Sequence, residues 1–236
     1  MKITGLQKMT LLDFPGRIAC TVFLQGCNFR CPFCHNSDLL GPEGMTEIST
    51  EELLTFLKKR KGMLDGVCIT GGEPTVQRDL PDLLRSIKAL GYPVKLDTNG
   101  SNPAMLKALV AEGLVDYVAL DIKNSKDKYD LTTGVANLSM DKIEESMVFL
   151  LEGTVDYEFR TTVVRELHSE EDFQNMAHWI LSLSSGKRAK RLFLQSYVDR
   201  DSVLCPGYTA PERREMENFL AAVSGCADSA QIRGTE

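Results

Sequence analysis

The sequence lacks a long apolar run, an excess of positive charge and any internal repeat. No stretch approaches the roughly 20 apolar residues of a membrane-spanning helix, so we expect no membrane segment. The formal net charge is -6. Such a chain does not attract phosphate backbones, so we expect no nucleic acid partner. Residues 1–16 contain Lys2 and Lys8 but no continuous apolar core. A secretory signal would have such a core, so the expected compartment is the cytoplasm.

The cysteines do not have the pattern of a disulfide framework. The seven are Cys20, Cys27, Cys31, Cys34, Cys68, Cys205 and Cys226. Their number is odd and three of them are bunched, whereas a framework needs an even number at spread-out positions. The bunched three are therefore interpreted as metal ligands. Cys20 and Cys68 lie within apolar runs and are expected to be small buried hydrophobes.

Short β-branched runs alternate with amphipathic stretches along the chain. The expected strands are 18–24, 66–70, 94–97, 117–122, 157–164, 191–196 and a short one at 230–233; the expected helices are 50–61, 80–90, 103–112, 140–152, 170–183 and 211–223. Strict alternation predicts an α/β fold with a parallel sheet, either doubly wound or an incomplete barrel. In both folds ligands gather at the carboxyl ends of the strands. Thr50 is the expected cap of its helix.

The loop after the first expected strand reads GCNFRCPFCHN, in which Cys27, Cys31 and Cys34 follow the pattern C-x3-C-x2-C. Thiolates are the natural ligands of Fe–S clusters, and this spacing can hold three corners of a cubane. The fourth iron would then be open to an outside ligand. A structural zinc site is the alternative, but such a site requires four ligands, and no second C-x2-C pair follows in the sequence.

With Phe33 before its last cysteine, this loop resembles the signature of the radical S-adenosylmethionine (SAM) superfamily. The resemblance implies that Cys27, Cys31 and Cys34 hold a 4Fe–4S cluster, that SAM chelates the open iron, and that Phe33 lies by the adenine. It also favours an incomplete (β/α)6 TIM-like barrel as one domain over 1–236. That domain would have an N-terminal lead at 1–16, a core at 17–200, and a C-terminal helix and short strand at 201–236.

Further motifs follow the next three expected strands. Gly71-Gly72-Glu73-Pro74 alone is typical of a plain turn, but it matches the superfamily segment at the methionyl ammonium of SAM. The segments DTNG and LDIK resemble those of glycyl-radical-enzyme activases, in which the counterparts of Asp97 and Lys123 lie at the ribose and carboxylate of SAM. In some members the counterparts of Asp97, Thr98 and Asp121 hold a monovalent cation, which is left open here. Asp121 and Lys123 are two apart in a strand and should share a face.

Four other positions carry open alternatives. Arg160 lies in an apolar strand and needs a partner, either a substrate carboxylate or a structural acid. Arg160 is assigned to the cofactor site, and by resemblance of the CHN segment so is Asn36, while His35 packs behind it. Asp13, in LLDFPG, grips a partner loop or caps a turn, and the turn is preferred.

The lead GLQKMTLLDFPG, the loop CPFCHN and the segments YVALDIKN and EFRTTVV resemble the activating protein of anaerobic ribonucleoside-triphosphate reductase. The resemblance implies an enzyme that cleaves SAM reductively and takes a hydrogen from a glycine Cα of a partner glycyl radical enzyme. A low-potential electron donor such as flavodoxin or ferredoxin would be its second partner. Two alternatives remain: a small-molecule radical enzyme of the 7-carboxy-7-deazaguanine synthase type, and a non-catalytic Fe–S or zinc binding protein.

Overall fold

The computed structural model describes residues 1–41, 46–200 and 202–234. The chain divides into two compact units. The first comprises Met1–Asn28 and Asp38–Ala119, and the second comprises Phe29–Ser37 and Leu120–Glu236. Strand β5 carries the chain from one unit to the next, because its residues fall on both sides of this division.

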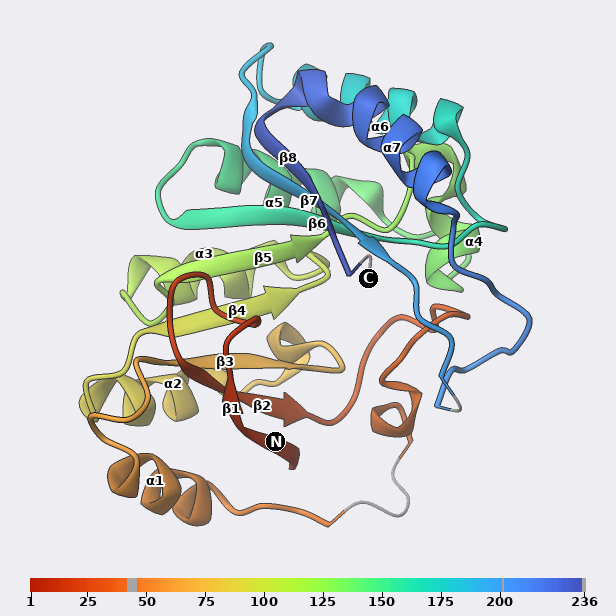
Figure 1. Cartoon of the computed structure of the whole chain (residues 1–236). Coiled ribbons are helices and arrows are strands. Elements are labelled where there is room, and N and C mark those ends of the chain that lie inside the picture. The colour runs from red at the N-terminus through yellow and green to blue at the C-terminus, as the bar shows by residue number, and fades with distance from the viewer. Residues whose placement is uncertain (42–45, 201, 235–236) are drawn as a thin grey trace. The chain divides into compact units, whose positions relative to one another are not determined.

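Eight strands are hydrogen-bonded in chain order from β1 to β8 (Figure 1). They are β1 (Ile3–Thr10), β2 (Ala19–Leu24), β3 (Gly66–Gly71), β4 (Val94–Thr98), β5 (Tyr117–Asp121), β6 (Asp156–Val163), β7 (Ala189–Ser196) and β8 (Ala227–Arg233). In the first unit β2, β3 and β4 are parallel, and in the second β6, β7 and β8 are parallel. The α/β expectation of an incomplete barrel with parallel strands is confirmed, since the order leaves β1 and β8 at its edges.

Strand β1 departs from the expectation for the first 16 residues, which were assigned as a lead. It pairs antiparallel with β2, from Ile3 opposite Leu24 to Thr10 opposite Ala19. Two register shifts interrupt this pairing, and Gln7 to Met9 are exposed. The alternation of buried and exposed residues that marks a half-buried strand is therefore broken. For this reason the sequence pattern does not predict β1.

Seven helices connect the described strands. They are α1 (Thr50–Lys59), α2 (Leu80–Ala89), α3 (Pro103–Ala111), α4 (Tyr129–Thr133), α5 (Met140–Leu151), α6 (Glu170–Leu183) and α7 (Arg213–Val223). Six match the expected helices to within two residues at each end. The short α4 was not expected, because five residues are too few to show a helical period. In the part of the chain that is described, no helix is long and apolar enough to cross a membrane.

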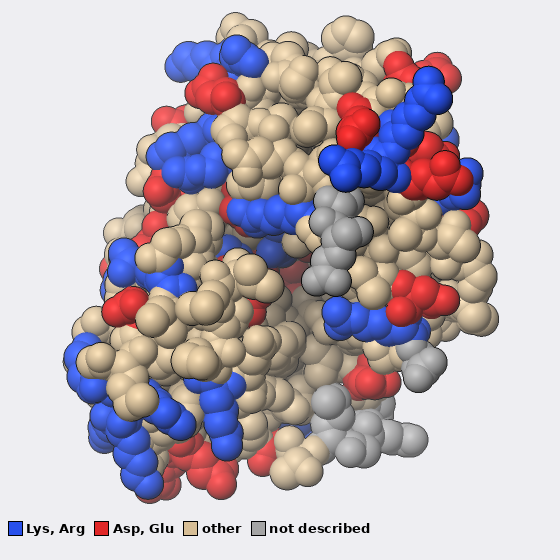
Figure 2. All heavy atoms as spheres, viewed as in Figure 1, with Lys and Arg blue, Asp and Glu red and all other residues tan. Residues whose placement is uncertain are grey.

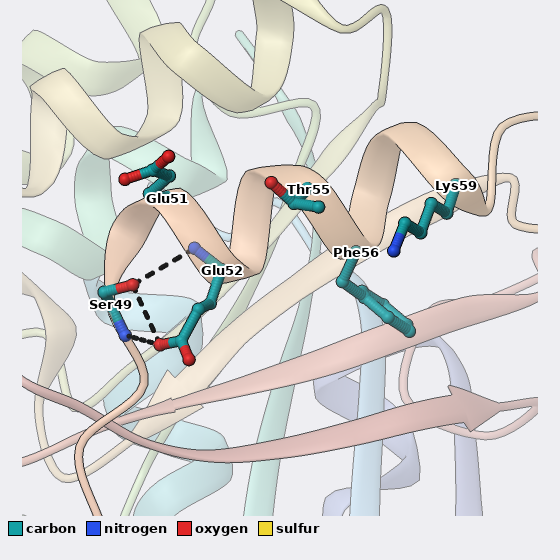
Figure 3. A pocket seen from close by; sticks show the side chains of 6 residues that line it. All are labelled: Ser49, Glu51, Glu52, Thr55, Phe56 and Lys59. Carbon is teal, nitrogen blue, oxygen red and sulfur yellow. Dashed lines mark hydrogen bonds between the residues drawn. The ribbon is translucent and has the colours of Figure 1, made fainter.

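Helix α1 shows how the sequence sets a helix end. The expected cap Thr50 is wrong, because Ser49 is the N-cap. The Ser49 hydroxyl accepts from the Glu52 amide at 3.1 Å, and the Glu52 carboxylate accepts from the Ser49 amide at 2.8 Å (Figure 3). This reciprocal pair satisfies two backbone donors that the helix leaves without partners. A shallow pocket beside it is lined by α1 and its cap.

Buried apolar side chains fill each unit behind the sheet. In the first, Leu53 and Leu57 of α1 and Leu84 of α2 are fully buried. In the second, Phe173 of α6 stacks on Phe219 of α7 with ring centroids 4.8 Å apart. The apolar faces of these helices pack in the core. The polar motifs lie instead at the ends of strands, at Gly71–Glu73, Asp97–Asn99 and Asp121–Lys123.

Candidate active site

The Gly71-Gly72 pair ends β3 with the backbone in close contact with the end of β2. The Gly72 amide donates to the Leu24 carbonyl at 2.8 Å, and the Glu73 amide donates to the Gly26 carbonyl at 2.8 Å. Gly71 has φ +117°, and a Cβ there would lie 2.4 Å from backbone atoms of Leu24. A Cβ on Gly72 would lie 2.1 Å from the Gly26 carbonyl oxygen. Only glycine allows this approach at both positions.

Glu73 is a fully buried carboxylate whose hydrogen-bond partners are all neutral. It accepts from the Thr75 amide at 3.0 Å and from the Thr75 hydroxyl. It also accepts from the Thr98 hydroxyl at 2.7 Å and the Asn99 amide at 2.6 Å. Burial raises the pKa of Glu73, while these donors oppose the shift. Among the described residues none forms an ion pair with it. A buried carboxylate of this kind fits a ligand that brings its own positive charge.

Asp97, near the end of β4, pairs with Lys95, a cation that was not among the expected site residues. The Lys95 ammonium is 1% exposed and pairs with the Asp97 carboxylate. The Cys68 thiol is 3.8 Å from the same carboxylate oxygen. Lys95 and Asp97 are two apart in a strand and therefore share a face. The same spacing that was applied to Asp121 and Lys123 would have found Lys95.

In the second unit Asp121 lies between two cations. The Arg160 Nε donates to one carboxylate oxygen at 2.8 Å, and the Lys123 Nζ donates to the other at 3.1 Å. The expectation that Asp121 and Lys123 share a face is confirmed. Of the two partners considered for Arg160, the structural acid is present. All three side chains are less than a third exposed, at 28% for Asp121, 16% for Lys123 and 14% for Arg160.

In this cluster the neighbouring charges together shift the pKa values of Asp121 and Lys123 more than burial does. Burial would raise the pKa of Asp121, but Arg160 and Lys123 outweigh it and hold that pKa well below its usual range. Burial would lower the pKa of Lys123, but Asp121 outweighs it and raises that pKa. The raised pKa keeps the Lys123 ammonium charged, so it can also donate to a carboxylate of a ligand.

The cysteine loop is divided between the two units. Cys27 belongs to the first, and Cys31 and Cys34 belong to the second. None of the three is in a disulfide. Burial raises the pKa of Cys31, and the Lys123 ammonium acts in the opposite direction. No group of three His, Cys, Asp or Glu side chains is gathered as metal ligands in the described ranges. The chemistry of the donor set fits an Fe–S cluster, since three thiols within eight residues are its usual ligands.

The second half of the loop is fastened within its own unit to the segment that follows β7. The His35 ring stacks on Tyr197 with centroids 5.2 Å apart, and its Nε2 is 2.7 Å from the Val198 carbonyl. The Cys205 amide donates to the Pro32 carbonyl at 2.8 Å. Burial lowers the pKa of His35, as expected for a ring that packs. Cys205, which the sequence left without a role, thus has an exposed side chain on a backbone bonded to the loop.

The remaining expected residues are placed as follows. Phe33 is buried and Asn36 is half-buried, both in the second unit. The Asp13 carboxylate accepts from the Thr21 hydroxyl, and the Thr10 hydroxyl accepts from the Asp13 amide at 3.4 Å. These contacts support the turn assignment for Asp13. On the face in Figure 2, acidic and basic side chains are interspersed.

The comparisons with known proteins agree on one family. The family model described as the Radical SAM superfamily matches residues 21–180. A Methanocaldococcus jannaschii protein, provisionally named a glycyl-radical enzyme activating enzyme, is 33% identical over 182 residues, which cover 74% of this chain and 73% of that protein. The pyruvate formate-lyase-activating enzyme of Clostridium pasteurianum is 36% identical over 146 residues, 59% of this chain and 60% of that protein.

Two further likenesses are more limited. The 7-carboxy-7-deazaguanine synthase of Hyperthermus butylicus is 40% identical over 92 residues, 39% of this chain and 38% of that protein. Among solved structures, Streptococcus suis SuiB superposes with a TM-score of 0.69 at 15% identity, covering 92% of this chain. The chain spans 49% of SuiB, so this likeness concerns the fold.

Proposed function

The chain belongs to the radical SAM superfamily, and from this premise we propose that it activates a glycyl radical enzyme. The observation that carries the proposal is the match to activating enzymes, which extends over 74% of the chain for one of them. The match to the small-molecule enzyme covers 39%. We propose an anaerobic ribonucleoside-triphosphate reductase as the partner. The electron donor would be flavodoxin or ferredoxin, and the compartment the cytoplasm, where thiols stay reduced.

The proposed cofactors are a 4Fe–4S cluster on Cys27, Cys31 and Cys34, and SAM on the open iron. When bound, they would supply one-electron reductive cleavage of SAM and removal of a hydrogen atom from a glycine Cα of the partner, with the electron coming from the donor protein. The three thiols must lose their protons to act as ligands. Phe33 and Asn36 are proposed to contact the bound SAM, and Gly71 and Gly72 to let its methionyl group approach the backbone.

The charged residues are proposed to orient SAM by its own charges. Glu73 has only neutral partners in the protein, so the methionyl ammonium would supply the missing positive charge. The charged ammonium of Lys123 would hold the methionyl carboxylate, and Arg160 would assist it by pairing with Asp121. Asp97 would contact the ribose. A monovalent cation at Asp97, Thr98 and Asp121 has no support from the Lys95 pairing, which already neutralises Asp97.

The test is anaerobic reconstitution of the cluster, reduction in the presence of SAM, and addition of the candidate reductase. We expect 5′-deoxyadenosine by product analysis and a glycyl signal by electron paramagnetic resonance. Cys31→Ala should abolish both, because the cluster loses one of three anchors. Cys205→Ala, the matched control on an exposed cysteine of the same unit, should retain both.

Two results would contradict the proposal. Turnover of a small molecule without any protein partner, and no glycyl signal, would favour the 7-carboxy-7-deazaguanine synthase type. Absence of 5′-deoxyadenosine from the fully reconstituted parent would favour a non-catalytic Fe–S or zinc binding protein.

A further inference from the structure

The backbone of Lys123 is held on both sides by buried side chains of the second unit. Its amide donates to the Tyr129 hydroxyl at 3.3 Å. Its carbonyl oxygen lies 3.0 Å from the Nε2 of His168. Tyr129 is fully buried and His168 is 5% exposed. Tyr129 comes from α4 and His168 from the turn between β6 and α6. Two separate elements therefore meet at the backbone of one residue, on the peptide groups before and after its Cα.

The hydrogen bonds of His168 define its tautomer. The Nδ1 lies 3.1 Å from both the amide nitrogen and the carbonyl oxygen of Val164, and the Nε2 lies 3.0 Å from the Lys123 carbonyl oxygen. The Val164 amide can donate only to an unprotonated Nδ1, and the Lys123 carbonyl can accept only from a protonated Nε2, so the tautomer with its proton on Nε2 makes both of these bonds. Burial lowers the pKa of His168, so the ring is neutral at ordinary pH and its Nδ1 is an acceptor. The Val164 amide donates to that Nδ1 at 3.1 Å. Each nitrogen of the ring is thus committed to a backbone group.

The residues after Lys123 are held by the same two elements and by α6. The side-chain amide of Asn124 donates through its Nδ2 to the Thr132 hydroxyl at 2.9 Å and to the Leu167 carbonyl at 3.0 Å. The Ser125 hydroxyl donates to Asp172 at 3.3 Å. Asn124 and Ser125 are buried. A fully satisfied buried polar network of this kind is rigid, because each broken bond would leave a buried group without a partner.

We infer that His168 and Tyr129 are positioning residues for the reaction: they clamp the Lys123 backbone on both sides of its Cα, so that the ammonium is held in place for the cofactor carboxylate. The inference rests on the proposed function of Lys123. A long, flexible lysine side chain gives a defined contact only when its Cα is fixed. Neither His168 nor Tyr129 has a motif around it, so the sequence pattern gave no signal for either.

The clamp is tested by the equilibrium affinity of the reconstituted, unreduced protein for SAM, which requires no turnover. His168→Asn keeps an acceptor near the Nδ1 position but cannot reach the Lys123 carbonyl. His168→Gln reaches further and restores a donor there. We expect the dissociation constant of SAM to rise roughly tenfold in His168→Asn and in Tyr129→Phe, since each loses one bond to the clamp. In His168→Gln it should rise less than about threefold.

A double-mutant cycle separates positioning from a general loss of structure. Lys123→Met removes the ammonium itself, so adding His168→Asn to it should raise the dissociation constant no further. Trp179, the single tryptophan, meets the Tyr129 ring edge-on with centroids 5.9 Å apart. Its fluorescence should be unchanged in His168→Asn. An unchanged spectrum would mean that the surroundings of Tyr129 remain intact in the variant.

The outcomes distinguish the two levels of the proposal. If the reconstituted parent does not bind SAM, the proposed function is wrong. If the parent binds SAM and His168→Asn binds it equally well, the clamp is wrong. The clamp is also wrong if His168→Asn weakens binding as much in the Lys123→Met background as in the parent, because His168 then acts independently of Lys123.

Discussion

The two units place carboxylates of opposite surroundings at the ends of their strands. Glu73, in the first, is fully buried and accepts hydrogen bonds from neutral donors alone. Asp121, in the second, lies between Arg160 and Lys123. Burial raises the pKa of Glu73, whereas the two cations lower that of Asp121. The first site therefore has no cation among its described partners, whereas the second has two cations beside its carboxylate. The proposed function assigns the methionyl ammonium of SAM to the first carboxylate and the methionyl carboxylate to Lys123.

The first way to break this comparison is Glu73→Gln. If Glu73 pairs with the methionyl ammonium, the variant should bind SAM roughly 30- to 100-fold more weakly, because a charge-assisted bond in a buried site is lost. The free energy of unfolding should also fall, by about 1–2 kcal/mol, since an amide cannot accept at both ends and one backbone or hydroxyl donor loses its partner. Calorimetric titration and urea unfolding measure the two effects.

Glu52→Gln is the matched control for that variant. Glu52 also accepts from a backbone amide and a hydroxyl, both of Ser49, but it is exposed at the start of α1. The change should lower the free energy of unfolding only slightly, through the lost cap, and leave SAM affinity unchanged. Equal SAM affinity for Glu73→Gln and the parent would contradict the assignment of Glu73 to the ammonium.

The second prediction concerns the cationic side of the comparison. Asp121→Asn leaves the Lys123 and Arg160 charges without their carboxylate. We expect the free energy of unfolding to fall by about 2–3 kcal/mol, somewhat less than for a fully buried pair because Asp121 is 28% exposed. Asp156→Asn, which breaks the more exposed pairs with Lys190 and Arg191, should cost less than about 1 kcal/mol. If urea unfolding gives the two variants equal losses, Asp121 does not hold its unit together.

The sequence predicted the parts of this site that depend on local spacing. The alternation of strands and helices located Glu73, Asp97 and Lys123 at strand ends, and the two-residue spacing paired Asp121 with Lys123. These features depend on the backbone period alone, so a single sequence contains them.

The sequence could not predict contacts that join distant segments. His168 reaches Lys123 across 45 positions of the chain, and His35 reaches Val198 across 163. Neither pair has a characteristic spacing, because tertiary packing brings the residues together. The antiparallel strand β1 was missed for a related reason: its pairing with β2 overrides a sequence with a broken alternation.

The smallest expected effect is on the pH dependence of stability, measured in the protein without its cluster. Glu73 and Asp121 should contribute to the free energy of unfolding in different pH ranges. The pKa of Glu73 is raised above its unfolded value of about 4.3. Its protonation therefore stabilises the fold fully below that value, and this contribution is lost as pH rises through the folded pKa. The pKa of Asp121 is depressed. Its contribution is present above the unfolded value of about 3.9 and is lost as pH falls through the folded pKa.

Urea unfolding at stepped pH should therefore give two different profiles. Between pH 7 and about 4.5 the parent should gain stability relative to Glu73→Gln, whereas its advantage over Asp121→Asn should stay level and shrink only below about pH 3.9. Subtracting each variant from the parent cancels the titration of groups that the substitution leaves alone. A level difference for Glu73→Gln across this range would mean that the Glu73 carboxylate is as well compensated in the fold as in water. The contrast between the two sites would then not extend to their charges.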